Sequence, residues 1–229
     1  SILTVHGETD NNSAYELTLK NTDPGTGASL LDSFSLAKSF TTELTVYGGL
    51  IGIPFGNYYT HLVSDPLLIS SFDYTQPGIG LDWDGGVYAL SAVLFNNTSS
   101  SKADAYCFRI AAPLQDNLSV GLDYLKNGSA DPALNVFAEW SNGPLALETE
   151  LSSQGDDSYA SIGGLYQLTK CLAAAARYDQ SSVSNVDSKV TAVGANVFMD
   201  DITLIAEYQF SDSGGTTNQK MLTKASLEF

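Results

Sequence analysis

Short segments in which apolar and polar residues alternate recur through most of the chain, each about ten residues long. In one of them the alternate positions are Ile202, Leu204, Ala206, Tyr208 and Phe210, separated by Thr203, Ile205, Glu207 and Gln209. Successive side chains of a β-strand point to opposite faces, so each segment predicts a strand with one apolar and one polar face. No other feature restricts the fold as strongly, because a chain built from such strands has to form a sheet.

The alternation predicts fifteen strands, at residues 1–7, 13–21, 30–37, 42–53, 77–83, 86–95, 103–112, 118–126, 132–140, 144–152, 158–168, 171–179, 189–198, 201–210 and 219–229. Every connection between them can be an up-and-down hairpin, and a sheet of this kind closes into a barrel. The predicted fold is therefore all-β, a transmembrane up-and-down antiparallel β-barrel that occupies residues 1–229 as a single domain. Because single-chain bacterial barrels have an even number of strands, we expect about sixteen, with the first strand preceding Ser1. Direct pairing of Ser1 with the last strand would contradict this count.

The connections between the predicted strands alternate in length. Tight connections read "PLQDN", "SNGP", "LTK" and "FMDD", whereas longer ones read "NNTSSSKAD", "SSQGDDS", "SSVSNVDS" and "SDSGGTTN". The longer set is rich in Ser, Asn, Asp and Gly, which are typical of loops. We therefore expect short turns at one end of the sheet and longer loops at the other.

Charged side chains fall on the less apolar face of the predicted strands. They are Asp82, Arg109, Asp123, Glu139, Glu148, Glu150, Arg177, Glu207, Lys220 and Lys224. This many charges argue against a dry interior, so we expect water on this face and outer-membrane lipid on the apolar face. The alternative is a soluble β-sandwich, in which apolar faces meet each other and hairpins are mixed with long crossover connections.

The composition excludes some partners. The 229 residues carry 10 Lys and Arg against 26 Asp and Glu, a formal net charge of −16, which argues against binding to nucleic acid or to an anionic membrane surface. Cys107 and Cys171 are far apart and have no His or Cys beside them at metal-ligand spacing, so we expect free thiols, and the sequence leaves their redox state open. The N-terminus lacks the basic-then-apolar run of a signal peptide, and we expect Ser1 to be a mature or trimmed start.

An enzyme is not expected. A hydrolase would need a nucleophile with a positioned base, and the chain has only two histidines, His6 and His61, which do not form a recognisable arrangement. The acidic pairs Asp156-Asp157 and Asp200-Asp201 lack the spacing of an EF-hand and are expected to be solvated turns. The sequence therefore predicts neither a cofactor nor a metal site.

Residues 50–75 interrupt the alternation and include two prolines. The preceding strand is expected to end near Ile53, and the loop that follows is the longest in the chain. In porin-type barrels such a loop can fold into the mouth and narrow the pore, with Tyr58, Tyr59, His61 and Asp65 as the candidate constriction residues. Packing of the loop on its own rim is an equally open alternative.

The same stretch resembles a known family. Pro54, Phe55 and Gly56, followed by Ser64, Asp65 and Pro66, look like the PFG…SDP segment of the LbtU-type siderophore porin family of Gram-negative outer membranes, and the similarity extends over residues 31–97. The resemblance implies an outer-membrane barrel that passes a small iron chelate.

Electrostatics leaves the solute open. A channel with a net negative wall repels anionic ferric chelates and favours cations. Arg109, Arg177, Lys220 and Lys224 could form a local basic track for anions, or they could pair with Glu148, Glu150 or Glu207 and keep the wall rigid.

The chain ends in "MLTKASLEF", an alternating strand with an aromatic last residue. This ending resembles the last strand of bacterial outer-membrane barrels, and the resemblance implies recognition of Phe229 by the barrel-assembly machinery. We therefore expect a passive outer-membrane channel for small solutes. The alternative is a structural or partner-docking barrel with a plugged lumen, and protein partners or an oligomer remain possible.

Overall fold

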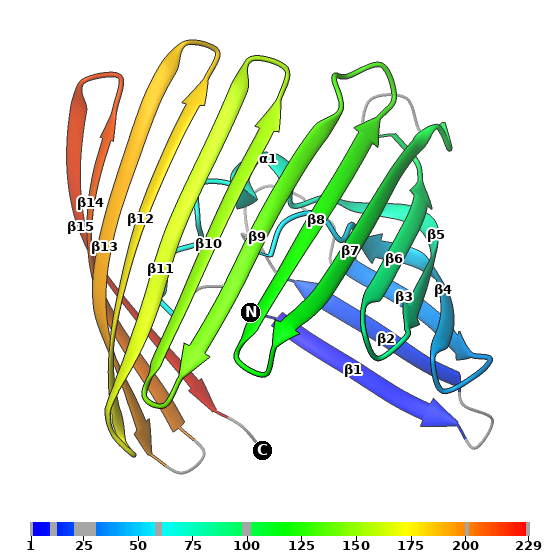
Figure 1. Cartoon of the computed structure of the whole chain (residues 1–229), viewed down its shortest axis with the longest axis horizontal. Helices are drawn as coiled ribbons and strands as arrows, with labels where there is room; N and C mark the ends of the chain where they lie inside the picture. Colours follow the sequence, from blue (N-terminus) through cyan, green and yellow to red (C-terminus); the bar gives the residue numbers. More distant parts are fainter. Residues whose placement is uncertain are drawn as a thin grey trace. The chain divides into compact units, whose positions relative to one another are not determined.

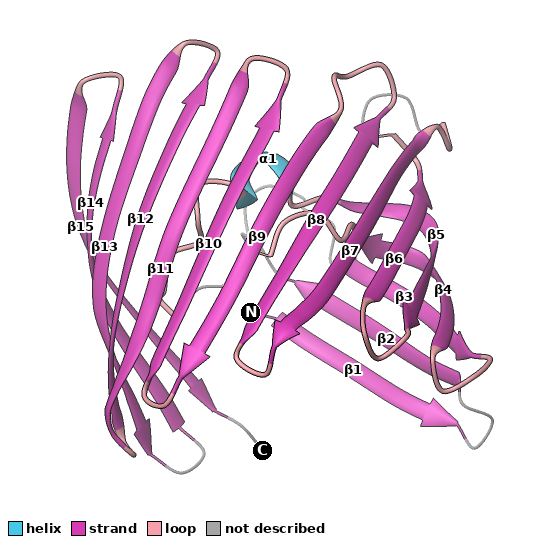
Figure 2. Cartoon of the chain, in the orientation of Figure 1, coloured by secondary structure: helices cyan, strands magenta, loops and turns pink. Residues whose placement is uncertain are grey.

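The computed structural model describes residues 2–9, 13–20, 31–57, 61–97, 102–199 and 202–227. Within these residues the chain is all-β except for one short helix, α1 (Ile69–Phe72) (Figures 1 and 2). The strands are β1 (Ile2–Thr9), β2 (Ser13–Lys20), β3 (Leu31–Ser39), β4 (Leu44–Gly52), β5 (Thr75–Asp84), β6 (Ala89–Phe95), β7 (Ala105–Gln115), β8 (Leu118–Asn127), β9 (Ala133–Asn142), β10 (Leu145–Gln154), β11 (Asp157–Thr169), β12 (Leu172–Val183), β13 (Val186–Met199), β14 (Ile202–Ser213) and β15 (Thr216–Leu227). Each overlaps one of the fifteen predicted segments, so the prediction of fifteen strands is confirmed.

The strands form one antiparallel sheet in which spatial order equals chain order, from β1 to β15. Every connection between described neighbours is therefore a hairpin, as the sequence predicts. In the order formed by the described residues, β1 and β15 are the first and last strands. A sixteenth strand remains a prediction. Among the described residues, no helix is both long enough and apolar enough to cross a membrane.

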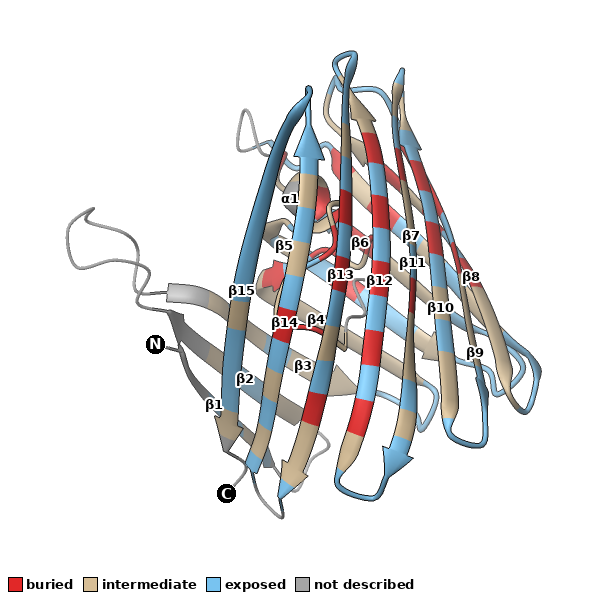
Figure 3. Ribbon diagram, turned by 90° about the vertical axis from the view of Figure 1, so that its left-hand side faces the viewer, coloured by how far each residue is buried: buried red, intermediate tan, exposed pale blue. Residues whose placement is uncertain are grey.

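Burial along the strands follows the predicted alternation. In β12, Arg177, Asp179 and Ser181 are buried, whereas Tyr178 and Gln180 are exposed, and Figure 3 shows β12 banded accordingly. The buried face of β9–β14 is the one on which residues 61–72 pack, and it carries the predicted charges; we call it the polar face of these strands.

The opposite face of the same strands is apolar and exposed. Its large side chains include Leu147, Leu151, Ile162, Val193, Leu204 and Tyr208. Soluble monomers rarely expose apolar patches larger than a few hundred Å². In the sheet of a soluble protein the apolar face is buried and the charged face is exposed. Here the charged face is buried and the apolar face is exposed, which is typical of strands that face lipid.

The connections differ from the predicted pattern of long loops. Two-residue turns close three of the four connections that we expected to be long: Gly155-Asp156, Ser184-Asn185 and Gly214-Gly215. The Ser- and Asp-rich residues beside these turns are paired residues of the strands. They are polar on both faces, so they show no apolar–polar alternation, and for this reason the sequence pattern predicts loops there. The fourth connection, 96–104, lies partly outside the described residues. The prediction of a loop-rich end is therefore wrong for β10–β15.

The chain divides into two compact units. Unit 1 comprises Ser1–Phe55, Asp73–Ala112 and Asp123–Pro132, and unit 2 comprises Gly56–Phe72, Pro113–Leu122 and Ala133–Phe229. The long loop after β4 therefore belongs to unit 2, although it connects two strands of unit 1. Whether 1–229 behaves as a single domain stays a prediction.

In unit 1, Pro54 and Phe55, which precede Gly56, lie at the end of the chain's first described run of strands, shortly after β4. Phe55 is fully buried, and the carbonyl oxygen of Pro54 accepts a hydrogen bond of 3.4 Å from the thiol of buried Cys107. Cys171, by contrast, is exposed, and both cysteines are free thiols in the structure.

Candidate functional site

Segment 61–72, a described part of the long loop between β4 and β5, lies on the polar face of unit 2. The segment follows Gly56, whose φ of 82° is in the left-handed region that favours glycine. Tyr58 and Tyr59, two of the predicted constriction residues, lie outside the described residues. The structure places the described residues 61–72 against the strands of unit 2.

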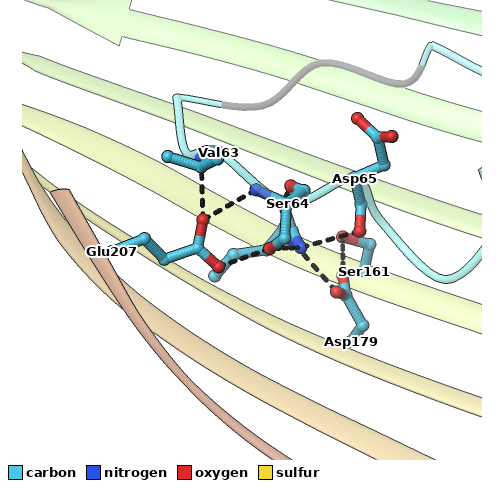
Figure 4. Close-up of polar contacts among 7 residues, drawn as sticks. Val63, Ser64, Asp65, Ser161, Asp179 and Glu207 are labelled. Atoms are coloured by element: carbon cyan, nitrogen blue, oxygen red, sulfur yellow. Dashed lines mark hydrogen bonds and ion pairs between the residues drawn. The ribbon is translucent and has the colours of Figure 1, made fainter. Parts of the chain in front are cut away.

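A buried carboxylate on β14 holds the middle of the segment. Glu207 is only 2% exposed, and its Oε2 accepts hydrogen bonds of 2.7 Å from the backbone N–H groups of Val63 and Ser64 (Figure 4). The Ser64 hydroxyl donates a third hydrogen bond, to Oε1. Hydrogen bonds to an ionised carboxylate are roughly twice as strong as neutral ones, so this acid fixes the Ser64 turn firmly.

A buried guanidinium on β12 contacts the same turn. Arg177 donates to the carbonyl oxygen of Ser64 at 2.6 Å, to its hydroxyl at 3.0 Å and to the carbonyl oxygen of Asp65 at 2.9 Å. Its Nε donates to Asp179 Oδ2 at 2.8 Å, and the Ser161 hydroxyl donates to the other oxygen of Asp179 at 2.7 Å. We name Ser64, Arg177, Asp179 and Glu207 the clamp.

An apolar side chain next to the clamp adds packing. Leu62 is buried against Ala175 and Ala192, with Leu165 packed beside them. Gly194 makes room for it, because an added Cβ at this position would lie 2.6 Å from Leu62 Cδ2 and 2.6 Å from the carbonyl oxygen of Ala206. The small residues on the polar face, which could equally have lined an open pore, here form a socket for Leu62.

Two further contacts hold the ends of the segment. The amide of Asn196 donates to the carbonyl oxygen of His61 at 2.9 Å. At the other end, the Tyr159 hydroxyl bonds the Ser71 hydroxyl at 2.8 Å, and its ring packs edge-on against Phe72 with centroids 5.4 Å apart. The segment is thus tied to β11, β12, β13 and β14.

The start of the loop is anchored by two other predicted acids. The backbone N–H of Asn57 donates to Glu150 Oε1 at 2.7 Å, and its side-chain amide donates to Glu139. Asn135 donates to the same Glu150 oxygen at 2.8 Å, and Ser119 donates to Glu139 at 3.2 Å. These carboxylates are therefore structural acceptors as well as charges on the polar face.

A cavity of about 370 Å³ opens in unit 2 beside His61. Its polar lining includes Glu139 and Glu148, which lie directly opposite each other in the β9–β10 register. His61 Nε2 lies 4.0 Å from a Glu148 oxygen. Burial lowers the pKa of His61 below its usual value of 6.5, so the imidazole is neutral at pH 7 and adds no positive charge to the cavity wall.

In unit 1 the structure pairs Arg109 with Asp123, at 3.4 Å, and places the Tyr47 hydroxyl 3.5 Å from Asp82. Both arginines thus face acids, as one of the two sequence alternatives has it. Arg109 meets Asp123 and Arg177 meets Asp179, while Glu207 binds Ser64 of the turn that Arg177 also contacts. Lys220 and Lys224 lie exposed on β15.

Several residues of the site were not predicted. Asp179 is the most important, and its position two residues after Arg177 on the same strand face was an available signal. Asn57, Asn135 and Asn196 carry no charge and have no distinctive spacing in the sequence. Among the described residues, no group of three or more His, Cys, Asp or Glu side chains is placed to hold a metal ion.

Comparisons with known proteins identify the fold. No family model matches the chain, and no curated protein matches it. Solved porins do match over the whole of this chain and 89% of theirs: a variant of the Rhodobacter blastica porin at a TM-score of 0.74 and 11% identity, and another at 0.72 and 14%. An anion-selective porin from Comamonas acidovorans matches with the same coverages at 0.78 and 11%. The fold is that of a porin β-barrel.

Identities this low establish the porin fold alone. The Comamonas porin is anion-selective by its description, whereas the polar face of unit 2 described above carries more carboxylates than cations. Charge selectivity therefore has to be argued from the residues of this chain. The resemblance of the PFG…SDP segment to siderophore porins likewise remains a hypothesis.

Proposed function

We propose that this chain is an outer-membrane barrel that lets small solutes pass through a water-filled channel without energy input. The observation that carries the proposal is the fastening of segment 61–72 to the polar face through buried charged groups, behind strands whose other face is apolar and exposed. A long loop held on the wall of a porin-fold barrel leaves the rest of the cross-section to water and solute. The porin fold supports the outer-membrane location.

The charge of the wall favours cations. The described residues of the polar face of unit 2 and of segment 61–72 that are not buried include the acids Asp65, Glu139 and Glu148 and the cations Lys220 and Lys224, whereas Glu150, Asp179, Glu207 and Arg177 are buried. Carboxylates that line a channel raise the local concentration of cations. We therefore expect small cations to permeate more readily than anions.

The solute class follows from the same charges. If iron chelates are among the solutes, as the resemblance implies, neutral or cationic chelates are expected to pass and anionic ones to be retarded. Two residues of the SDP segment contact the strands: the Ser64 hydroxyl bonds Glu207, and the carbonyl oxygen of Asp65 accepts from Arg177. These contacts support a structural role for the segment. The motif by itself therefore does not select a siderophore.

The test is single-channel recording of the purified, refolded protein in a planar bilayer, with a KCl gradient to read selectivity. Discrete steps and a reversal potential of the cation-selective sign are expected. A protein that inserts correctly but stays silent would overturn the channel and favour the structural or partner-docking barrel. Recognition of Phe229 by the assembly machinery is a separate proposal, because this residue lies outside the described part of the chain.

A further inference from the structure

We infer that the cavity of about 370 Å³ beside His61 is a binding site for a small organic cation, whose ammonium or guanidinium group meets Glu148 and Glu139. We call it the cation cavity. The inference deepens the proposed function and rests on it, because solutes have to reach the polar face before the cavity can hold one class of them. It concerns binding at one place, and not the average charge of the channel.

The first argument is the size and the lining of the cation cavity. Its volume of about 370 Å³ lies within the range of about 300–1,000 Å³ in which proteins bind small molecules. Pro113 and Ala146 add apolar surface to the lining, and Gln115 and Asn117, at the connection between β7 and β8, add amides. Such a mixture of apolar and polar groups fits an organic molecule, and the space is much larger than the roughly 30 Å³ of one water molecule.

The second argument is a carboxylate that lacks a hydrogen-bond donor. The Glu148 side chain is 13% exposed, and no described residue donates a hydrogen bond to it; the nearest cationic nitrogen is His61 Nε2 at 4.0 Å. An added Cβ on Gly163 would lie 2.5 Å from Glu148 Oε1, so the glycine leaves room for this carboxylate. Buried polar groups in proteins are normally hydrogen-bonded, and one that is not calls for a partner such as a bound ion.

The third argument is charge. Glu139 lies directly opposite Glu148 in the β9–β10 register, and both line the cavity. Glu139 already accepts hydrogen bonds from Asn57 and Ser119, so it adds a second negative charge to a site at which Glu148 is the open acceptor. The described lining includes neither lysine nor arginine, and His61 is neutral at pH 7 because burial lowers its pKa. The cavity therefore favours a cation.

The class of cation follows from the groups that the cavity offers. Among the described residues no group of three or more His, Cys, Asp or Glu is placed to hold a metal ion, so a bare divalent ion would lack ligands. An ammonium or guanidinium group carries several N–H donors and forms charge-assisted hydrogen bonds with carboxylates. The amides of Gln115 and Asn117 can bond hydroxyl or amide groups elsewhere on the same ligand.

The experiment measures binding of N-acetylarginine amide to the whole protein in detergent micelles, by isothermal titration calorimetry at pH 7. N-acetylcitrulline amide is the matched ligand, because a neutral urea group replaces the guanidinium at nearly the same size. We expect saturable binding of the charged ligand and at least about tenfold weaker binding of the neutral one, since hydrogen bonds between charged groups are the stronger kind. Equal affinity for the two ligands would overturn the inference.

The variant Glu148→Gln keeps the shape of the side chain and removes its negative charge. It is expected to weaken binding of N-acetylarginine amide at least about tenfold. Asp187→Asn is the matched control, because it removes one negative charge from an exposed position outside the cavity lining, and wild-type affinity is expected. The same affinity in both variants would overturn the role of Glu148. The comparison of the two ligands needs no substitution, so it decides the question even if Glu148→Gln does not fold.

Single-channel recording separates this inference from the proposed function. Calorimetry in micelles detects binding without a membrane, whereas the bilayer detects conduction. A conducting wild type without saturable binding of N-acetylarginine amide would overturn the cation cavity alone. A silent wild type that prefers the charged ligand would overturn the channel and support the cation cavity.

Discussion

A single glycine shows how closely the segment and the wall are fitted. Gly194 lies on β13, where a Cβ would approach both the Ala206 carbonyl oxygen and Leu62 Cδ2 at 2.6 Å. Real Cβ atoms essentially never come so close to other atoms, and the carbonyl oxygen belongs to the neighbouring strand, which cannot move cheaply. Glycine at this position therefore allows both the pairing of β13 with β14 and the packing of Leu62 against β13.

The substitution Gly194→Ala is expected to lower the free energy of unfolding by about 1–3 kcal/mol, the usual cost of overpacking. Urea-induced unfolding in detergent micelles, followed by tryptophan fluorescence, measures this change. Gly52→Ala is the matched control, because nothing lies within 4 Å of a Cβ added there. Equal stability of the two variants would show that the β13–β14 ladder relaxes without cost.

At the scale of the elements, the hairpin turns are the most sequence-dependent parts of the sheet. The β12–β13 turn has positive φ at two non-glycine residues, Ser184 at 51° and Asn185 at 65°. This is the geometry of a type I′ turn, whose twist matches that of the flanking strands. The backbone N–H of Ser184 also donates to Asp157 Oδ1 at 2.8 Å, which links this turn to the start of β11.

Replacing Ser184 by valine is expected to destabilise the protein by about 1–2 kcal/mol, because a β-branched residue is strained in the left-handed region. Ser184→Gly keeps the backbone hydrogen bond to Asp157 and removes the strain, so no loss of stability is expected. The same urea titration compares the two. If the valine variant is as stable as the glycine variant, the turn has changed its type without disturbing the pairing of β12 with β13.

At the scale of the whole molecule, the acidic wall is expected to determine ion selectivity. Glu139 and Glu148 face each other across β9 and β10 beside the cavity, and like charges directly opposite are destabilising in a sheet. The register thus places two acids side by side on the wall of this cavity.

Glu139→Gln combined with Glu148→Gln is expected to shift the reversal potential in a KCl gradient toward zero, and more strongly at 0.1 M than at 1 M salt because of screening. Asp156→Asn with Asp187→Asn removes two charges from exposed positions at turns and is expected to leave the reversal potential unchanged. The neutral His61 beside Glu148 makes no positive contribution near pH 7. Equal shifts in the two double variants would assign selectivity to net charge, not to the wall.

The fifteen strands, their hairpin order and the two faces of each strand could be predicted from the sequence. The alternation of side chains along a strand and the closing of a hairpin both depend on residues that are close together in the chain. A short stretch of sequence is therefore enough to predict them. The strand ends were predicted less well. The Ser-rich flanks of β12 and β13 lack an apolar face and read as loops, yet their backbone pairs as fully as that of the central residues.

The position of segment 61–72 and the contacts of the charged residues were decided by the tertiary structure alone. Ser64 meets Arg177 across 113 positions of the chain and Glu207 across 143. No periodicity relates residues so far apart, since their meeting depends on which strands the sheet places side by side. The sequence by itself determined an amphipathic sheet with charges on one face, and the fold decided which of those charges hold the loop.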